Sequence, residues 1–395
     1  MAATTQELNI NISTRKAKRL IMSSFEAGLV PFLWGGPGIG KSDLIREIGR
    51  QTGRPVIDMR LLLLEPTDLK GIPYYNPVTN TMKWAPVGEL PQPGDVSLEN
   101  AILFLDELNA ANPAVQGAAF QLILDRRIGE YVLPEGVSMV AAGNRLTDGG
   151  AAHRMLSPLA NRLAHFHLET NFDDWFEWGA NNKIHPEILG YLQQHRANLN
   201  TFANSKGHLA FATQRSWAKF SKWLSLPYNH ADDEIEIMCA ANVGYGVAVE
   251  YMAHRQHVQG LPSPEDVLFG KVTTLEAKEI SAKYSLIISL AYALADYEKL
   301  QGATVTKEDD ASQLPNALNE YLRNKKVKIF NEKEFNSLVD VFLTYVMLSD
   351  NFQKEMKILG LRILLCNFNV KVDVHGQVVR EVTKQFGHLI NDKGE

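Results

Sequence analysis

A glycine-rich segment early in the chain has the residue types and spacing of a phosphate-binding loop. Residues 35–42 read GGPGIGKS and satisfy the pattern G-x-x-x-x-G-K-[ST]. In such a loop backbone N–H groups turn toward the phosphates, the lysine reaches the β- and γ-phosphates, and the serine hydroxyl binds Mg²⁺. The expected nucleotide-binding residues are Gly35, Gly36, Pro37, Gly38, Ile39, Gly40, Lys41, Ser42 and Asp43, with Ser42 also a metal ligand.

Two acidic residues downstream could complete a hydrolytic site. Asp106 and Glu107 follow the apolar run ILFL at 102–105. Asp106 would support the magnesium shell and Glu107 would polarise a water molecule, the roles expected at the end of a Walker B strand. Taken alone, this pattern is better explained by an ordinary strand end, but the phosphate loop upstream favours catalysis.

Asn144 is a third candidate, because it follows the apolar run VSMVAAG at 137–143. A side-chain amide at that place can orient a water molecule or contact the γ-phosphate. A turn-capping asparagine is the alternative interpretation of the residue by itself.

The hydrophobic pattern predicts the elements that must position these residues. Apolar runs typical of strands lie at 30–34, 55–60, 101–107, 137–144 and 163–169, with helical spacing between several of them. This alternation predicts one α/β domain with a parallel sheet flanked by helices. Because parallel strands end at one edge of a sheet, the loop, the acids and Asn144 are expected to lie at that edge.

The pattern changes after residue 170, where helical segments replace the strands. A turn-rich segment at 258–271 then separates a further helical region. We therefore expect three domains, namely an α/β domain at 1–170, a helical lid at 171–260 and a helical C-terminal extension at 261–395.

The order of these motifs resembles the AAA+ ATPases, and among them the MoxR group with its CbbQ/NorQ-type activators. The resemblance covers roughly residues 14–260 and includes LSPLANRL at 156–163. Its most specific part is EPTDLKGIPYYNPVTNTMKWAPVGELP at 65–91, which looks like the β-hairpin inserted around helix 2 in that group. A second hairpin is implied at about 126–138, before the sensor strand.

The resemblance implies further site residues and an assembly. It makes Asn144 the sensor 1 residue, Arg162 the arginine finger supplied to a neighbouring subunit, and Arg215 the sensor 2 residue. Family members usually have Asp-Arg-Phe at the finger, whereas this chain has NRL at 161–163, which leaves Arg154 and Arg126 as alternatives. A finger in trans implies a homo-oligomer, expected to be a hexameric ring that uses ATP and Mg²⁺.

The expected function is ATP hydrolysis coupled to remodelling, activation or maturation of a protein partner. The resemblance implies that this partner could carry a von Willebrand factor A domain on a separate chain. A nucleic-acid motor or a McrB-like restriction subunit is the alternative, and a small-molecule kinase with the same loop fits the acids and Asn144 less well. The basic runs RKAKR and RNKKVK are short and separated, which favours solvated helix faces over a nucleic-acid site.

Composition narrows the class of protein. The chain has 45% hydrophobic and 22% charged residues and a net charge of -5, so it lacks the basic excess of a dedicated duplex-binding protein. Cys239 and Cys366 have no metal-type spacing, and no apolar run is long enough to span a membrane. We expect a cytoplasmic protein without a signal peptide.

Two other groups of residues leave alternatives open. His165 and His167 alternate along one strand but lack a third metal ligand at recognisable spacing. Tyr74, Tyr75 and Trp84 flank the turn of the predicted insert. They could grip a partner chain in a central pore, or they could pair across the hairpin and hold it together.

Overall fold

The computed structural model describes residues 11–145, 148, 155–205, 207–306 and 313–391. These residues form two compact units. The first comprises the chain up to Asp174 together with 202–204 and 213–215, and the second contains 175–201, 205–212 and 216 onward.

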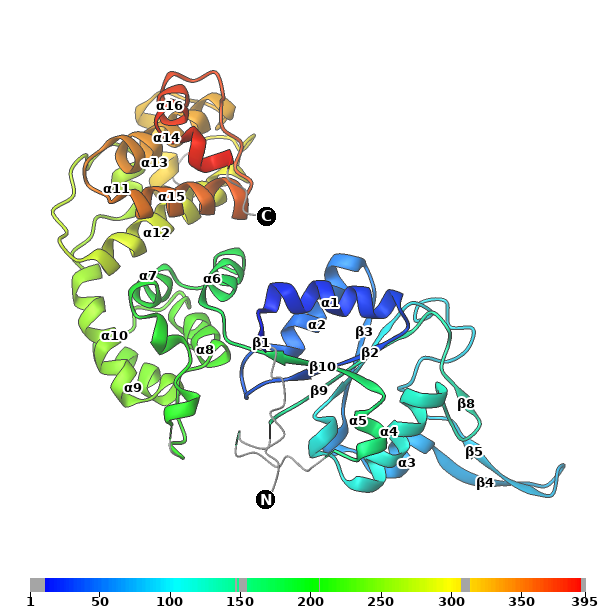
Figure 1. Cartoon of the computed structure of the whole chain (residues 1–395). Coiled ribbons are helices and arrows are strands. Elements are labelled where there is room, and N and C mark those ends of the chain that lie inside the picture. The colour runs from blue at the N-terminus through cyan, green and yellow to red at the C-terminus, as the bar shows by residue number, and fades with distance from the viewer. Residues whose placement is uncertain (1–10, 146–147, 149–154, 206, 307–312, 392–395) are drawn as a thin grey trace. The chain divides into compact units, whose positions relative to one another are not determined.

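A parallel sheet of six strands forms the centre of the first unit (Figure 1). The strand order is β1-β10-β2-β9-β6-β3, and every neighbouring pair is parallel. The strands are β1 Asn11–Ile12, β2 Val30–Trp34, β3 Val56–Arg60, β6 Ile102–Asp106, β9 Ser138–Gly143 and β10 Leu163–Leu168. The central strands are buried on both faces, as their continuous apolar runs require. The predicted α/β fold is confirmed.

Helices cover both faces of this sheet. On one face α1 (Thr14–Glu26) and α2 (Lys41–Thr52) bury Ile21 and Ile45 against Leu33 of β2. On the other face α4 (Pro113–Asp125) buries Leu122 against Phe32, and the short α3 (Pro66–Lys70) and α5 (Ser157–Ala160) add to the same core. Alternate residues of one strand thus serve opposite cores, which fixes the register of the strand.

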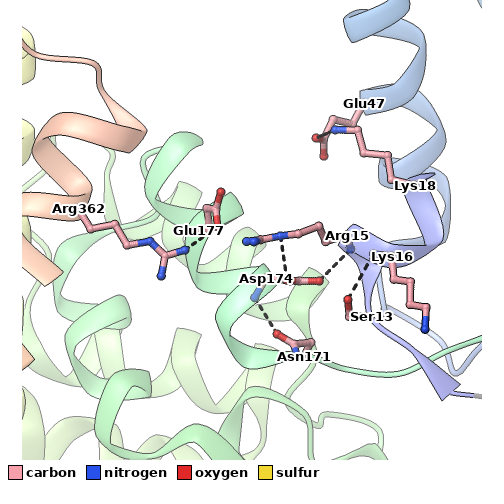
Figure 2. A network of polar contacts seen from close by, with 9 residues as sticks. All are labelled: Ser13, Arg15, Lys16, Lys18, Glu47, Asn171, Asp174, Glu177 and Arg362. Atoms are coloured by element: carbon pink, nitrogen blue, oxygen red, sulfur yellow. Dashed lines mark hydrogen bonds and ion pairs between the residues drawn. The ribbon is translucent and has the colours of Figure 1, made fainter. Parts of the chain in front are cut away.

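The start of α1 is tied to the end of the first unit (Figure 2). The Asp174 carboxylate accepts a hydrogen bond of 2.8 Å from the Arg15 backbone N–H and lies 3.6 Å from Arg15 Nε. The Ser13 hydroxyl caps the same helix by accepting from the Lys16 N–H. A carboxylate at a helix N-terminus is also favoured by the helix dipole. The chain therefore leaves the first unit from a fixed point beside α1.

Two hairpins lie outside the main sheet. The first pairs β4 (Ile72–Asn76) with β5 (Thr81–Ala85) and extends away from the sheet (Figure 1). Tyr75 lies opposite Met82 and Tyr74 opposite Lys83, so the aromatic residues do not pair with one another across the strands. The second hairpin is short and pairs β7 (Arg127–Ile128) with β8 (Tyr131–Val132).

The second unit is helical in its described part. Apart from the first residues of α6 and α8, which belong to the first unit, it contains α6 Phe172–Asn181, α7 Pro186–Gln194, α8 Gln214–Leu224, α9 Asp232–Val243, α10 Tyr245–Val258, α11 Pro264–Leu268, α12 Ile280–Glu298, α13 Asn316–Asn324, α14 Glu332–Leu343, α15 Lys354–Arg362 and α16 Gln377–Asn391. The central α12 packs against α7, α10, α14 and α15. The buried His254 of α10 hydrogen-bonds Ser281 of α12 and the Glu187 carbonyl of α7. The division of this part near residue 260 stays a prediction.

No helix among the described residues is long and apolar enough to cross a bilayer.

Candidate functional site

The glycine-rich loop joins the end of β2 to the start of α2. Gly38 and Gly40 have φ values of +74° and +92°, which side-chain-bearing residues rarely adopt. Gly40 is the N-cap of α2 and makes no side-chain cap, so the backbone N–H groups at this helix end face the loop without a competing side chain. Such an end binds anions through its N–H groups and its dipole.

Lys41 lies inside this loop. Its ammonium donates hydrogen bonds to Gly35 O (2.6 Å), Gly36 O (3.2 Å) and Asn144 Oδ1 (2.9 Å). The pKa of Lys41 is lowered from 10.5 to about 8, chiefly by burial and to a smaller extent by Arg215, against the raising effect of Asp106 and the other nearby carboxylates. A buried cation of this kind gains most from a ligand that carries negative charge.

Ser42 and Asp106 face each other at the carboxyl edge of the sheet. Ser42 Oγ donates to Asp106 Oδ2 over 3.0 Å, and Asp106 Oδ1 accepts the Glu107 backbone N–H over 2.9 Å. Mg²⁺ prefers oxygen ligands and commonly takes one or two carboxylates together with nucleotide phosphates. The donor set of one hydroxyl and one buried carboxylate beside a phosphate loop fits this ion, so Ser42 and Asp106 are the residues that would hold it.

Glu107 occupies a strained backbone position. Its φ and ψ are 58° and 31°, in the left-handed region, and it directly precedes the 3₁₀ turn Leu108–Ala110. A non-glycine residue pays about 1–2 kcal/mol for this conformation. Strain of this kind is concentrated at functional sites, where it fixes the direction of a side chain.

Asn144 follows β9, and its two oxygen atoms contact different parts of the site. Oδ1 accepts from Lys41, as described above, and the backbone oxygen accepts from Asn109 Nδ2 over 2.8 Å. The structure therefore brings Lys41, Ser42, Asp106, Glu107 and Asn144 together at one edge of the sheet, as the sequence predicts. The catalytic roles of these residues stay predictions.

The remaining predicted loop residues contribute in different ways. Ile39 is a buried member of the core on the α1 and α2 face of the sheet, so it can offer a ligand only its backbone. Asp43 is exposed and its carboxylate accepts from Arg46 over 3.2 Å. Pro37 lies in the turn between the two glycine pairs.

Three residues from beyond the sheet contact the loop. The Arg215 N–H donates to Gly38 O over 3.3 Å, and its side chain is exposed. Thr213 fills the space beside Gly38, where an added Cβ would lie 2.8 Å from its hydroxyl oxygen, and the Phe202 ring packs on Gly36. Arg215 was expected from the resemblance, whereas no pattern in the sequence pointed to Thr213 or Phe202.

Asp148 is a further acidic residue that sequence reasoning missed. It raises the pKa of Lys41, and its Oδ2 accepts the Arg145 N–H over 2.9 Å. The sequence offers only its position four residues after Asn144 as a signal.

The candidates for the arginine finger differ in where they lie and in what they already contact. Arg162 is exposed and directly precedes β10, whose first residue pairs with Val30 at the start of β2. It therefore lies at the amino edge of the sheet, about 15–20 Å along the five-residue β2 from the phosphate loop. This distance excludes Arg162 from the site of its own chain and leaves a role in trans as a prediction.

Arg126 is already engaged by backbone carbonyls of the segment between β8 and β9, so as an alternative finger it is disfavoured. Its guanidinium donates to Pro134 O (2.7 Å), Glu135 O (3.2 Å) and Val137 O (2.7 Å). Arg154 lies outside the described residues.

His165 is committed to contacts within the sheet. Trp34 Nε1 donates to its Nδ1 over 2.9 Å, which requires the Nε2–H tautomer that donates to Ala160 O. Among the described residues, no three His, Cys, Asp or Glu side chains are grouped so as to hold a metal ion. Cys239 is buried and Cys366 exposed, and both are free thiols.

A parallel sheet with a glycine-rich phosphate loop, the adjacent acids Asp106 and Glu107, and Asn144 at one edge is the arrangement of a P-loop nucleotide-binding site. Residues 31–163 match the AAA domain of the dynein-related subfamily. This segment contains every predicted site residue from Gly35 to Arg162, so the chain carries an AAA ATPase domain. A comparison with curated protein sequences found no significant match.

Solved structures matched by the chain include RuvB from Thermotoga maritima, described as a Holliday junction branch migration motor. It has 15% identity and a TM-score of 0.33, and the alignment covers 82% of this chain and 93% of RuvB. NtrX from Brucella abortus has 14% identity and a TM-score of 0.33, with 55% of this chain and 51% of NtrX covered. This chain thus spans about half the length of NtrX.

Proposed function

We propose that this protein hydrolyses ATP to ADP and phosphate with Mg²⁺, in a homo-oligomeric ring of six subunits. Hydrolysis would be coupled to remodelling, activation or maturation of a protein partner in the cytoplasm, in the manner of the MoxR group that the sequence resembles. The observation that carries the proposal is the convergence of Lys41, Ser42, Asp106, Glu107 and Asn144 at the carboxyl edge of one sheet.

Each group in this arrangement has a defined task. The loop N–H groups and Lys41 would bind the β- and γ-phosphates. Mg²⁺, held by Ser42 and Asp106, would neutralise charge on the phosphate oxygens. Glu107 would accept a proton from the attacking water, and Asn144 would orient that water toward the γ-phosphate. The products are ADP and inorganic phosphate, with the proton left on Glu107 for release to solvent.

Assembly into a ring is supported by the place of Arg162. The predicted finger is exposed at the edge of the sheet opposite the phosphate loop. A residue there can complete an active site only in a second subunit, where an arginine finger is worth about 10³–10⁵ in turnover. Arg215 would act from its own chain, since its backbone N–H is bonded to the loop.

Coupling to a partner is supported by the β4–β5 hairpin. It extends from the sheet (Figure 1), and Tyr75, Val78 and Met82 on it are exposed. A small exposed ribbon with apolar side chains is suited to contact another polypeptide. We infer that the partner is a separate protein, with a von Willebrand factor A domain as the resemblance implies.

Two variants test the proposed hydrolysis. Phosphate release would be measured with Mg²⁺ and with excess chelator, and nucleotide binding by titration with a fluorescent ADP analogue. Lys41→Ala should lose nucleotide binding, whereas Glu107→Gln should bind normally and lose at least about a hundredfold in turnover. Unchanged turnover by Glu107→Gln would remove Glu107 from its role. Sedimentation with ATP and Mg²⁺ would show whether six subunits assemble.

A further inference from the structure

Asn109 is a buried side chain that joins two parts of the nucleotide site. It lies in the turn that follows Glu107 and is 0% exposed. Its Nδ2 donates to the backbone oxygen of Asn144 over 2.8 Å. Asn144 in turn accepts from Lys41 through Oδ1. One amide therefore connects the Glu107 turn with the chain segment that contacts the phosphate-loop lysine.

The structure makes room for this amide at the end of β9. A Cβ added to Gly143 would lie 2.0 Å from Asn109 Oδ1 and 2.7 Å from Phe32 Cζ. Real Cβ atoms do not approach other atoms this closely, so the residue before Asn144 must be glycine for Asn109 to reach its position. The contact between Asn109 and the sensor strand is therefore close and leaves little freedom of movement.

The turn that contains Asn109 begins at a strained residue, Glu107. Glu107 is held in the left-handed region, and the Ala110 N–H donates to Glu107 O over 2.9 Å to close the 3₁₀ turn. A strained residue keeps its conformation only when its surroundings over-determine it. The bond from Asn109 to Asn144 supplies such a restraint, because it fixes the turn to the neighbouring strand.

The Asn109 amide is only partly satisfied by hydrogen bonds. Asn109 Oδ1 is buried and has no hydrogen-bond partner within the described ranges. A buried polar atom without a partner costs free energy. Leucine, which has a similar shape, would avoid that cost at Oδ1 but would leave the Asn144 oxygen without its donor.

We propose that Asn109 is a positioning residue that holds Asn144 and the Glu107 carboxylate in one geometry around the γ-phosphate. The inference rests on the proposed function, because the γ-phosphate is the group that both side chains would face. Asn109 itself touches no ligand in this scheme and acts through Asn144 and the Glu107 turn.

Gln116 provides a matched control. It is 1% exposed, its Nε2 donates to Ala111 O over 3.0 Å, and its Oε1 also has no partner among the described residues. It lies on α4, outside the site. Asn109→Leu and Gln116→Met each remove one buried amide, keep the side-chain shape and leave one backbone oxygen without its donor. The two variants should therefore change the stability of the fold by similar amounts.

The experiment compares wild-type protein, Asn109→Leu and Gln116→Met in turnover and in binding of ADP and ATPγS. Asn109→Leu should lower kcat by about tenfold to a hundredfold, the effect of a misplaced catalytic group, while the Kd for ADP stays within about threefold. The preference for ATPγS over ADP should fall toward one. Gln116→Met should change neither kcat nor this preference.

The possible outcomes distinguish the proposed role of Asn109 from the proposed ATP hydrolysis. Equal kcat and equal ATPγS preference in Asn109→Leu and wild-type protein would overturn the role of Asn109. A wild-type protein that binds nucleotide without hydrolysing it would overturn the proposed hydrolysis, and the ATPγS preference would still test Asn109. Absence of nucleotide binding in the wild-type protein would overturn both.

Gly143→Ala provides a second, independent variant. It keeps the Asn109 amide but displaces it, because the added Cβ requires the space of Oδ1. The same loss of kcat and of ATPγS preference is expected in the fraction that folds, measured by circular dichroism. A folded Gly143→Ala protein with wild-type values for both would contradict the proposal.

Discussion

Lys41 Nζ lies 2.9 Å from Asn144 Oδ1, although the two residues are 103 positions apart in the chain. The ammonium has three hydrogen atoms, and its partners Gly35 O, Gly36 O and Asn144 Oδ1 use all of them. A phosphate that binds Lys41 must therefore displace at least one of these acceptors. The bond couples the binding lysine to the predicted sensor residue.

Nucleotide affinity should fall as the pH rises above about 8. Burial lowers the pKa of Lys41 from 10.5 to about 8. Below about pH 8 the folded protein keeps the buried amine charged, which costs stability. Between about pH 8 and 10.5 the amine becomes neutral in the folded protein and this cost is relieved. Phosphate binding needs the ammonium, so the Kd for ADP should rise by up to about tenfold per pH unit above 8. Titrations from pH 7 to 10 measure it.

Lys41→Arg is the control for this pH dependence, because arginine stays charged throughout the range. Whatever its value at pH 7, the Kd of this variant for ADP should stay constant up to pH 10. A flat profile for the wild-type protein would contradict the lowered pKa.

Gly38→Ala should weaken nucleotide binding more than Gly40→Ala does. Both glycines have a positive φ, so both substitutions pay about 1 kcal/mol of backbone strain. Only at Gly38 does the added Cβ meet another group, since Thr213 Oγ1 would lie 2.8 Å away and Thr213 Cβ 2.9 Å away. The Kd for ADP and the thermal midpoint of each variant measure the difference. Equal effects would show that the Thr213 contact does not constrain the loop.

Arg162→Ala should abolish turnover of its own homo-oligomer and leave nucleotide binding intact. Its place at the amino edge of the sheet means that it can serve only a neighbouring site. Mixing with Glu107→Gln subunits, which keep Arg162 but cannot hydrolyse, should restore part of the phosphate release. Mixing with the double variant Glu107→Gln/Arg162→Ala should restore none. Assembly without rescue in the first mixture would count against a finger in trans.

Arg126→Ala should lower the free energy of unfolding and not only the rate of ATP turnover. The variant loses three hydrogen bonds from the guanidinium to Pro134, Glu135 and Val137 carbonyls, which should cost about 1–3 kcal/mol of unfolding free energy in urea. Arg127→Ala, at the exposed neighbouring position, should cost little. A large loss of turnover in Arg126→Ala with unchanged stability would instead favour Arg126 as the finger.

The two predicted hairpins show where sequence reasoning reaches its limit. The resemblance implies hairpins within 65–91 and about 126–138, and the structure has their strands within 72–85 and 127–132. The aromatic pairing of the first hairpin depends instead on its register, which sets Tyr75 against Met82. A shift of one residue would change every pair, and the local pattern does not specify it.

The sequence by itself determined the phosphate loop, the strand that ends in Asp106 and Glu107, and the α/β class, because each depends on contiguous residues with strong local preferences. Only the tertiary structure decided which distant residues complete the site. The strand order β1-β10-β2-β9-β6-β3 sets β9 between β2 and β6, and this places Asn144 beside Lys41 and Asn109 beneath Asn144. Strands that are equally apolar do not reveal their order in the hydrophobic pattern. The contacts of Asn109, Thr213 and Phe202 at the site are therefore visible only in the folded structure.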